Sequence, residues 1–212
     1  MNRGLSAAVV ALCASSALAQ TAGMPPHAAA FTGSTRGYWF TAPVDFRMTG
    51  VQVLQNPATA NAFMNWSVVR FDANTPPPTF PLVTNAFQQL AFGLNQPSGA
   101  FAPVSLDILA GQVIGIYGNT TATAGTTTGI NSYTATLTTA TTSIFGNIVN
   151  LTRSGMQFHL GSATSPLGMH DIWQELTSTA VSRTQFTYTE IPAPASMALV
   201  GLGGLAAARR RR

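Results

Sequence analysis

Between residues 36 and 189, aromatic and β-branched residues alternate with polar ones in short runs that Pro, Gly and Asn interrupt. A period of two is typical of a strand with one buried face, and Pro, Gly and Asn are typical of the turns between strands. No stretch of this part keeps apolar residues at helical spacing. The pattern predicts strands over residues 36–42, 44–54, 64–72, 86–92, 103–109, 112–118, 131–138, 144–152, 155–160, 170–176 and 182–189.

A hairpin is predicted over residues 103–118. Val104, Leu106 and Ile108 alternate with polar residues and therefore share one face of a strand. Ala110-Gly111 supplies the turn before the returning strand. Each of the two strands is expected to bury one face.

The close spacing of the strands predicts an all-β fold, a jelly-roll-like β-sandwich over residues 35–190. The opening strand at residues 37–40 (GYWF) and the hairpin make this layout similar to galactose-binding-like extracellular sandwiches. That resemblance concerns the fold alone, because folds of this kind host many functions.

Two segments depart from the strand pattern. Residues 73–81 (ANTPPPTFP) are rich in proline, which predicts a stiff connection between strands rather than a recognition peptide. Residues 119–142 contain twelve threonines among small residues. Two interpretations of them stay open: a surface loop available for O-linked sugars, or an edge hairpin whose hydroxyls face water.

The N-terminal residues predict a secretory signal that forms a short helix. Arg3 is followed by an apolar run and by Ala17-Leu18-Ala19, so cleavage is expected after Ala19. The run is far shorter than the roughly 20 residues that a membrane span needs. Cleavage at this point removes Cys13, the only cysteine, so the core must hold the exported domain together without disulfides. Residues 20–34 are then predicted to be a linker, with His27 in a disordered stretch.

The net charge of +4 comes from the two ends of the chain. Between them, five arginines face six acidic residues: Arg36, Arg47, Arg70, Arg153 and Arg183 against Asp45, Asp72, Asp107, Asp171, Glu175 and Glu190. The arginines are not grouped along the sequence in a way that tracks a phosphate backbone. Nucleic acid is therefore not expected as a partner.

The polar residues of the domain are mostly Thr, Ser, Asn and Gln, which form hydrogen bonds but do not titrate. Asp72-Ala73-Asn74 is only a fragment of a calcium loop, and His159 alternates with Phe158 in a way that places it on the solvent face. We therefore expect neither an enzyme, nor a cofactor, nor a metal site.

One cluster leaves other functions open. In a strand over residues 170–176, Asp171, Trp173 and Glu175 share a face, and two carboxylates beside an aromatic ring could hold a sugar or a cation. Trp173 could equally be a core residue. With Tyr38 and Trp39 exposed as further aromatic platforms, the chain would be a carbohydrate-binding module. A hydrolase with a site around Asp171 and Glu175 is a third hypothesis.

The C-terminal segment has three parts in order. Ile191-Pro192-Ala193-Pro194 precedes an apolar stretch that reaches residue 208, and Arg209, Arg210, Arg211 and Arg212 follow. As a helix, residues 195–208 would be roughly 21 Å long, against a hydrocarbon core of about 30 Å. The arginines favour the cytoplasmic side of a membrane. Such a segment predicts transient anchoring rather than a permanent span, although an ordinary tail anchor is the alternative.

This tail resembles the PEP-CTERM sorting signal of Gram-negative envelope proteins. The family has Pro-Glu-Pro where this chain has Pro192-Ala193-Pro194. The resemblance, which covers residues 191–212, implies that an exosortase in the inner membrane recognises the tail and cleaves near the prolines. It further implies release to the cell surface or extracellular matrix. Extracellular polysaccharide is the partner expected of a carbohydrate-binding module there.

Overall fold

The computed structural model describes residues 18–126, 129–135, 140–156, 171–178 and 180–191. The helices predicted for the signal and the tail lie outside these residues, as do His159 and His170. One 3₁₀ turn, η1 (Asp72–Asn74), follows the fifth strand. The strands are β1 (Gln20–Ala22), β2 (His27–Gly33), β3 (Arg36–Thr41), β4 (Phe46–Val53), β5 (Phe63–Phe71), β6 (Phe87–Pro97), β7 (Ala102–Ile108), β8 (Val113–Thr121), β9 (Gly129–Thr134), β10 (Ala140–Ile144), β11 (Asn147–Gly155), β12 (Trp173–Gln174) and β13 (Thr184–Thr189).

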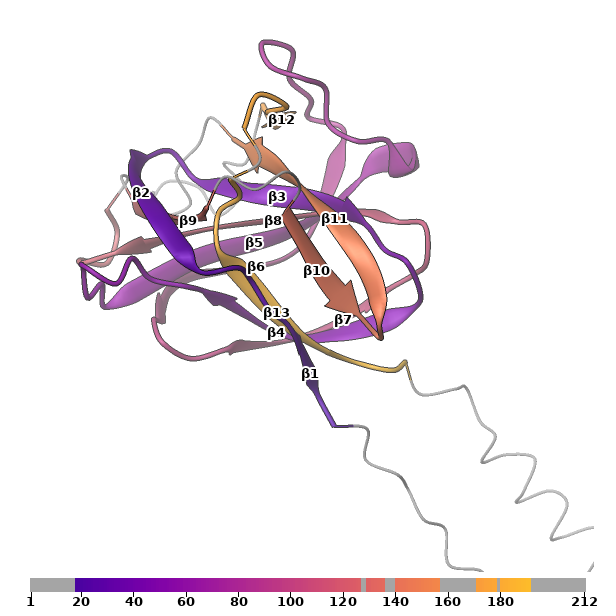
Figure 1. Ribbon diagram of the computed structural model, residues 1–212, viewed down its shortest axis with the longest axis horizontal. Helices are drawn as coiled ribbons and strands as arrows, with labels where there is room; N and C mark the ends of the chain where they lie inside the picture. Colours follow the sequence, from indigo (N-terminus) through magenta and orange to yellow (C-terminus); the bar gives the residue numbers. More distant parts are fainter. Residues whose placement is uncertain (1–17, 127–128, 136–139, 157–170, 179, 192–212) are drawn as a thin grey trace, which may run out of the picture.

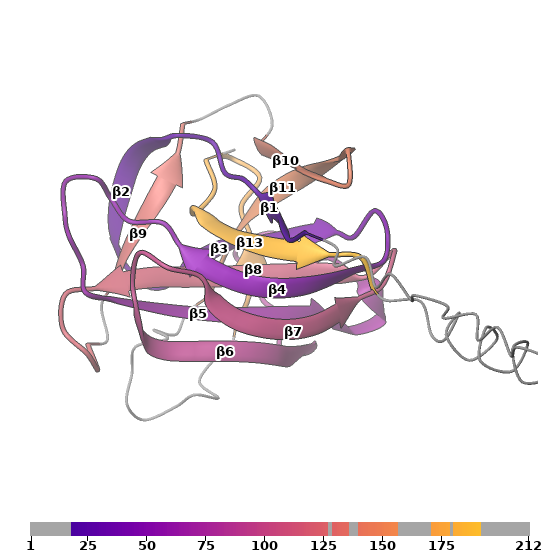
Figure 2. The same cartoon turned by 90° about the horizontal axis from the view of Figure 1, so that it is seen from below.

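The strands form two antiparallel sheets that curl and face each other like a sandwich (Figures 1 and 2). The smaller sheet has the order β1-β13-β4-β7. The larger sheet has the order β10-β11-β3-β8-β5-β6, with β12 paired to β11 and with the β2–β9 pair joined to it through β8. The prediction of an all-β fold is confirmed.

The main core lies between the two sheets. The ring of Phe186 on β13 stacks on Phe40 of β3, with 5.8 Å between ring centroids, and on Phe46 of β4 at 5.9 Å. Because β3 belongs to the larger sheet and β4 to the smaller, Phe186 joins the two layers. All three rings are buried, as the alternation of their strands predicts.

A second core lies on the opposite face of the larger sheet. Val69, Tyr117 and Ile172 belong to it, whereas the neighbouring residues Val68 and Ile116 belong to the main core. Successive residues of a strand point to opposite faces, so the centre of the larger sheet is covered on both sides. This is why every residue of β8 is buried.

Three sequence predictions are wrong. The hairpin does not form, because β7 pairs with β4 in the smaller sheet whereas β8 pairs with β3 and β5 in the larger one. Gly111, with φ of +81°, does make the turn, but the turn joins two layers. The strand at 144–152 is interrupted by a turn at Phe145-Gly146, where both residues have positive φ. The linker at 20–34 instead contributes β1 and β2 to the sheets.

The reason is that alternation determines which face of a strand is buried, but not which strand lies beside it. His27, for example, lies in β2 and its Nδ1 is 2.8 Å from the Ser132 hydroxyl on β9.

The threonine-rich segment fits neither interpretation entirely, since Thr120, Thr121 and Thr134 are buried in strands while Thr123 is exposed. The proline-rich residues do connect two strands, β5 and β6.

Alkaline pH is expected to destabilise the fold through Tyr38 and Tyr117, which are both fully buried. Burial raises the pKa of both phenols above the value of about 10 that holds in an unfolded chain. Stability is therefore intact below about pH 10 and falls above it, by about 1.4 kcal/mol per pH unit for each tyrosine. Urea unfolding between about pH 8 and pH 11 measures this, and Tyr38→Phe should reduce the slope. A slope that Tyr38→Phe leaves unchanged would contradict the assignment.

Candidate functional site

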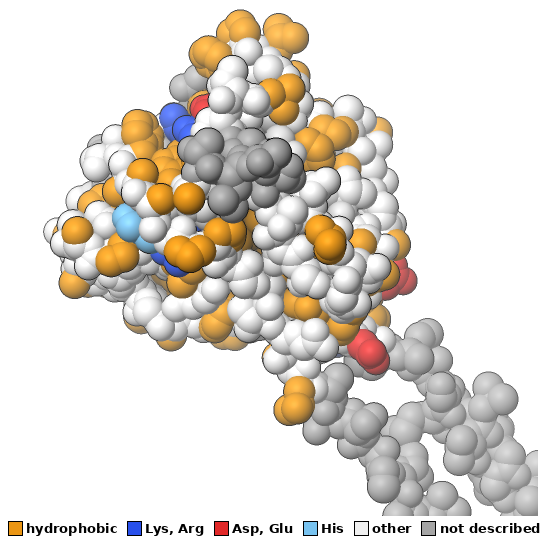
Figure 3. Space-filling model, in the orientation of Figure 1, with side chains coloured by type: hydrophobic (Ala, Val, Ile, Leu, Met, Phe, Trp, Pro, Cys, Tyr) orange, Lys and Arg blue, Asp and Glu red, His pale blue; other side chains and the backbone are white. Residues whose placement is uncertain are grey.

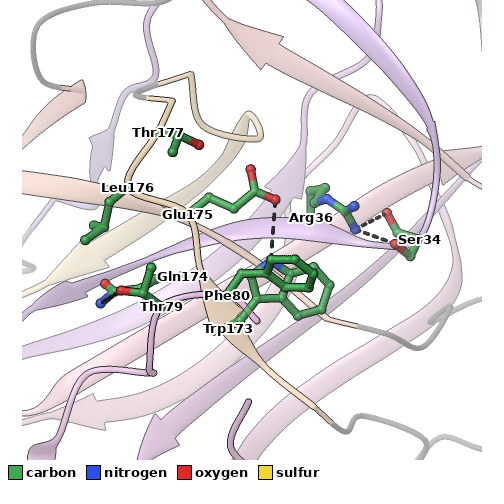
Figure 4. A pocket seen from close by; sticks show the side chains of 9 residues that line it. All are labelled: Ser34, Arg36, Thr79, Phe80, Trp173, Gln174, Glu175, Leu176 and Thr177. Atoms are coloured by element: carbon green, nitrogen blue, oxygen red, sulfur yellow. Dashed lines mark hydrogen bonds between the residues drawn. The ribbon is translucent and has the colours of Figure 1, made fainter. Parts of the chain in front are cut away.

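A pocket of about 400 Å³ opens on the outer side of the larger sheet (Figure 4). Three segments that are distant in sequence form it. Ser34 and Arg36 come from the β2–β3 connection and the start of β3, and Thr79 and Phe80 come from the connection between β5 and β6. The third segment is β12 with the three residues after it. In Figure 3, apolar side chains gather near the projecting β5–β6 connection, beside basic and acidic ones.

Backbone hydrogen bonds hold the β12 segment on both sides. On one side, the Glu175 N–H donates to the Arg153 carbonyl of β11 at 3.0 Å. On the other side, the Gln174 N–H donates to the Pro78 carbonyl at 2.9 Å, and the Phe80 N–H donates to the Gln174 carbonyl at 3.1 Å. The proline-rich connection is thus a structural neighbour of β12, and it places the ring of Phe80 at the pocket wall.

Two polar contacts from beneath fix the same segment. The Ser154 hydroxyl donates to the Trp173 carbonyl at 2.6 Å, and Ser154 Oγ lies 2.7 Å from the buried Tyr117 hydroxyl. The indole N–H of Trp39 donates to Gln174 Oε1 at 3.0 Å. A pocket wall held by buried groups of β8 and β11 and by the partly buried Trp39 of β3 is preorganised for binding, because little of it must be ordered when a ligand arrives.

Arg36 occupies one end of the pocket between two aromatic rings. Its guanidinium carbon lies 4.9 Å from the ring centroid of Phe31 and 5.3 Å from that of Trp173. Cation–π contacts at such distances hold the charged group in place. Arg36 Nη1 also donates to the Ser34 carbonyl and hydroxyl oxygens. Burial lowers the pKa of Arg36, but an arginine remains protonated at physiological pH.

Glu175 faces Arg36 across the pocket (Figure 4). Its carboxylate pairs with Arg153, with 2.6 Å between Nε and Oε2, and it accepts a longer contact of 3.4 Å from the Trp173 indole N–H. The guanidinium of Arg153 lies over the ring of Tyr133 at 4.6 Å. Two guanidinium groups and one carboxylate thus give this region a surplus of one positive charge.

The predicted sugar platforms are largely buried. Tyr38 is 0% exposed, and its hydroxyl donates to the Thr184 carbonyl at 2.5 Å, so it cannot touch a ligand. Trp39 is partly buried and supports Gln174 from below. Trp173 is 5% exposed, as a core residue would be, but it also lines the pocket. Each of the two sequence interpretations of Trp173 is therefore correct in part.

Asp171 does not join Glu175, and the prediction that Asp171, Trp173 and Glu175 share one face is wrong. Asp171 has φ of +55°, which interrupts the extended backbone, and β12 contains only Trp173 and Gln174. The Asp171 carboxylate accepts a hydrogen bond from Asn85 Nδ2 at 3.0 Å, outside the pocket. Over the described residues, no group of three or more His, Cys, Asp and Glu side chains gathers as a metal site would need.

The sequence interpretation missed Arg36, Phe80 and Arg153. Arg36 and Arg153 counted there only as dispersed charges, and Phe80 only as part of a connection. The sequence gives one signal, and it concerns only the two arginines. Each of them lies in a strand whose other residues are apolar or neutral, where an unpaired charge would be costly. That signal indicates that each arginine has a partner, but it does not identify the partner residue.

Comparison with known proteins bears on the tail. Residues 190–212 match the family model of the PEP-CTERM protein-sorting motif. The chain therefore carries a PEP-CTERM sorting motif at these residues, and this signal implies export, interaction with an exosortase, and a surface or extracellular location. Comparisons with curated proteins and with solved structures find no match. In the part of the chain that the structure covers, no helix is long and apolar enough to cross a membrane.

Proposed function

We propose that the all-β part of this chain is the mature form of a non-enzymatic protein of the cell surface or extracellular matrix. In this proposal, an exosortase removes the tail near Pro192 and Pro194 after transient anchoring in the inner membrane. The pocket has no catalytic role, and its carboxylate, Glu175, is already engaged by Arg153.

The observation that carries this proposal is where the strands begin and end. Cleavage after Ala19 would make Gln20 the first residue, and Gln20 is the first residue of β1. The last strand ends at Thr189, directly before the matched sorting motif. Gln20 pairs with Tyr188, so both ends of the folded part lie side by side (Figure 2). Both cuts would therefore leave every strand intact.

We further infer a jelly roll from the order of the strands. When β2 and β9–β12 are set aside as additions, β1, β3–β8 and β13 can be numbered one to eight along the chain. The smaller sheet then has the order 1-8-3-6, and the corresponding part of the larger one has 2-7-4-5. The chain thus passes repeatedly between two four-stranded layers, as in the paired Greek keys of a jelly roll.

Carbohydrate binding is the second candidate function, and the pocket favours it. Phe80 offers an aromatic surface that is 57% exposed, beside the hydroxyls of Ser34, Thr79 and Thr177. A volume of about 400 Å³ falls within the roughly 300–1,000 Å³ that small-molecule sites occupy. The polysaccharide of the envelope or matrix would be the partner.

Intact-mass spectrometry of the protein from its native host tests the sorting proposal. The surface or medium fraction should contain a form that starts at Gln20 and lacks Arg209–Arg212. Replacing Pro192 and Pro194 with alanine should shift the protein to an uncleaved, membrane-bound form, because the cleavage motif is lost. Pro57→Ala, an exposed proline in a turn, is the matched control and should be processed normally. A wild-type protein found in the cytosol with all four arginines would refute the proposal.

A further inference from the structure

We propose that the pocket binds an acidic sugar, such as a uronate unit of an extracellular polysaccharide, through Arg36. This inference rests on the second candidate function, carbohydrate binding, and names the class of glycan. Three features of the pocket carry it: its surplus charge, its exposed ring and the saturated backbone of its wall.

The first feature is the surplus positive charge around Arg36, Arg153 and Glu175. Glu175 forms an ion pair of 2.6 Å with Arg153 and acts on Arg36 only from a longer range, whereas Arg36 Nη1 donates to neutral oxygens of Ser34 and Thr35. The surplus positive charge of the region is therefore located at Arg36, which is half-buried in the pocket. A guanidinium in such a site forms stronger hydrogen bonds to a carboxylate than to a neutral acceptor, and its planar fork matches both carboxylate oxygens.

The exposed ring of Phe80 supplies the apolar contact. It packs against the buried Trp173, with 5.8 Å between centroids and an interplanar angle of 55°. The backbone hydrogen bond of Phe80 to Gln174 holds it beside β12. One face of a sugar ring carries mostly C–H groups, so it can rest on Phe80 while the hydroxyls at its rim reach Thr79 or Thr177.

The backbone of the wall separates a glycan from an acidic peptide. An extended peptide gains much of its affinity by adding main-chain hydrogen bonds to a free strand edge. At β12 the Glu175 N–H bonds to β11, and the N–H and carbonyl groups of Gln174 bond to the proline-rich connection. What remains in the pocket is side-chain hydroxyls, an amide, aromatic and aliphatic side chains, the Glu175 carboxylate and Arg36. Since Arg153 neutralises Glu175, the groups left for a uronate are the hydroxyls, the amide, the Phe80 ring and Arg36.

Isothermal titration of the protein isolated from its host tests this inference. The probes are tetragalacturonate, its neutral counterpart galactotetraose, and a glutamate tetrapeptide. We expect tetragalacturonate to bind most tightly. Arg36→Gln should weaken its binding about tenfold or more, as the loss of one charge-assisted contact predicts. Arg36→Lys should lie between, because the charge remains while the fork is lost.

Matched variants control for net charge and for folding. Arg70→Gln removes the same charge from a partly exposed arginine on β5 that contacts Gln88 outside the pocket, and it should leave the binding of all probes unchanged. Phe80→Ala should weaken the binding of tetragalacturonate and galactotetraose alike, because it removes the shared apolar contact. Thermal unfolding of each variant shows whether the fold has been kept, and Arg36→Lys still tests the guanidinium fork if Arg36→Gln unfolds.

The outcomes separate this inference from the functions it builds on. If galactotetraose binds as tightly as tetragalacturonate, or if Arg36→Gln has no effect, the acidic specificity is wrong while carbohydrate binding stands. If the glutamate tetrapeptide binds as tightly and competes for the pocket, the ligand class is wrong. If no glycan binds, carbohydrate binding itself fails, and the sorting proposal is still decided separately by intact mass.

Discussion

Replacing Phe186 with alanine is expected to lower the free energy of unfolding by about 3–5 kcal/mol. Phe186 is fully buried, and its ring contacts Phe40 and Phe46 at centroid distances of 5.8 and 5.9 Å. The cost has two parts, the lost burial of the ring and the cavity that remains between two sheets. Because the structure around a deleted core side chain relaxes only partially, the cavity is not expected to close fully.

Urea unfolding followed by tryptophan fluorescence measures this change. Ile148→Ala is the control, since Ile148 lies on β11 with 79% of its surface exposed and should change stability by no more than about 0.5 kcal/mol. A Phe186→Ala protein as stable as wild type would show that Phe186 does not join the sheets.

The second large effect is expected from Gly37→Ala on β3. A Cβ atom at Gly37 would lie 2.0 Å from the Ile116 carbonyl oxygen and 2.8 Å from the Tyr117 Cα. Both obstacles are backbone atoms of β8, which pairs with β3, so no side chain can rotate away to make room. The two strands must separate locally, at a cost of about 1–3 kcal/mol or more. Since Arg36 is the preceding residue, binding of tetragalacturonate should weaken as well.

Gly23→Ala is the matched glycine control. A Cβ atom there meets nothing within 4 Å, so stability and binding should stay near the wild-type values. Urea unfolding and the same calorimetric titration compare the two variants. If Gly37→Ala leaves stability unchanged, the close approach of β3 to β8 is not what excludes a side chain at this position.

The strands were the most predictable part of the fold. Residues 36–42 and 182–189, for example, correspond to β3 (Arg36–Thr41) and β13 (Thr184–Thr189), because their buried residues recur with a period of two. The linker prediction failed at β2 (His27–Gly33), whose HAAAFTG sequence is mostly exposed and carries little alternation. A strand that is stabilised mainly by pairing with β9 has no strong signal of its own.

The candidate site was only partly predictable. Trp173 and Glu175 were found because alternation in a strand over residues 170–176 places an aromatic ring and carboxylates on one face. Asp171 was included because a continuous strand was assumed, and its left-handed backbone conformation shows that the strand starts later. Arg36 and Phe80 lie far from Trp173 in sequence, and only the pairing of β11 with β3 and β12 brings Arg36 beside it.

The sequence by itself determined the all-β class and the sorting motif, because both are local properties: a period of two within each strand, and three short parts in order within residues 190–212. The tertiary structure decided which strands are neighbours, which aromatic rings are buried, and that Arg153 rather than Arg36 pairs with Glu175. These depend on contacts between residues far apart along the chain. Alternation indicates that a face is buried, but it carries no information about what covers that face.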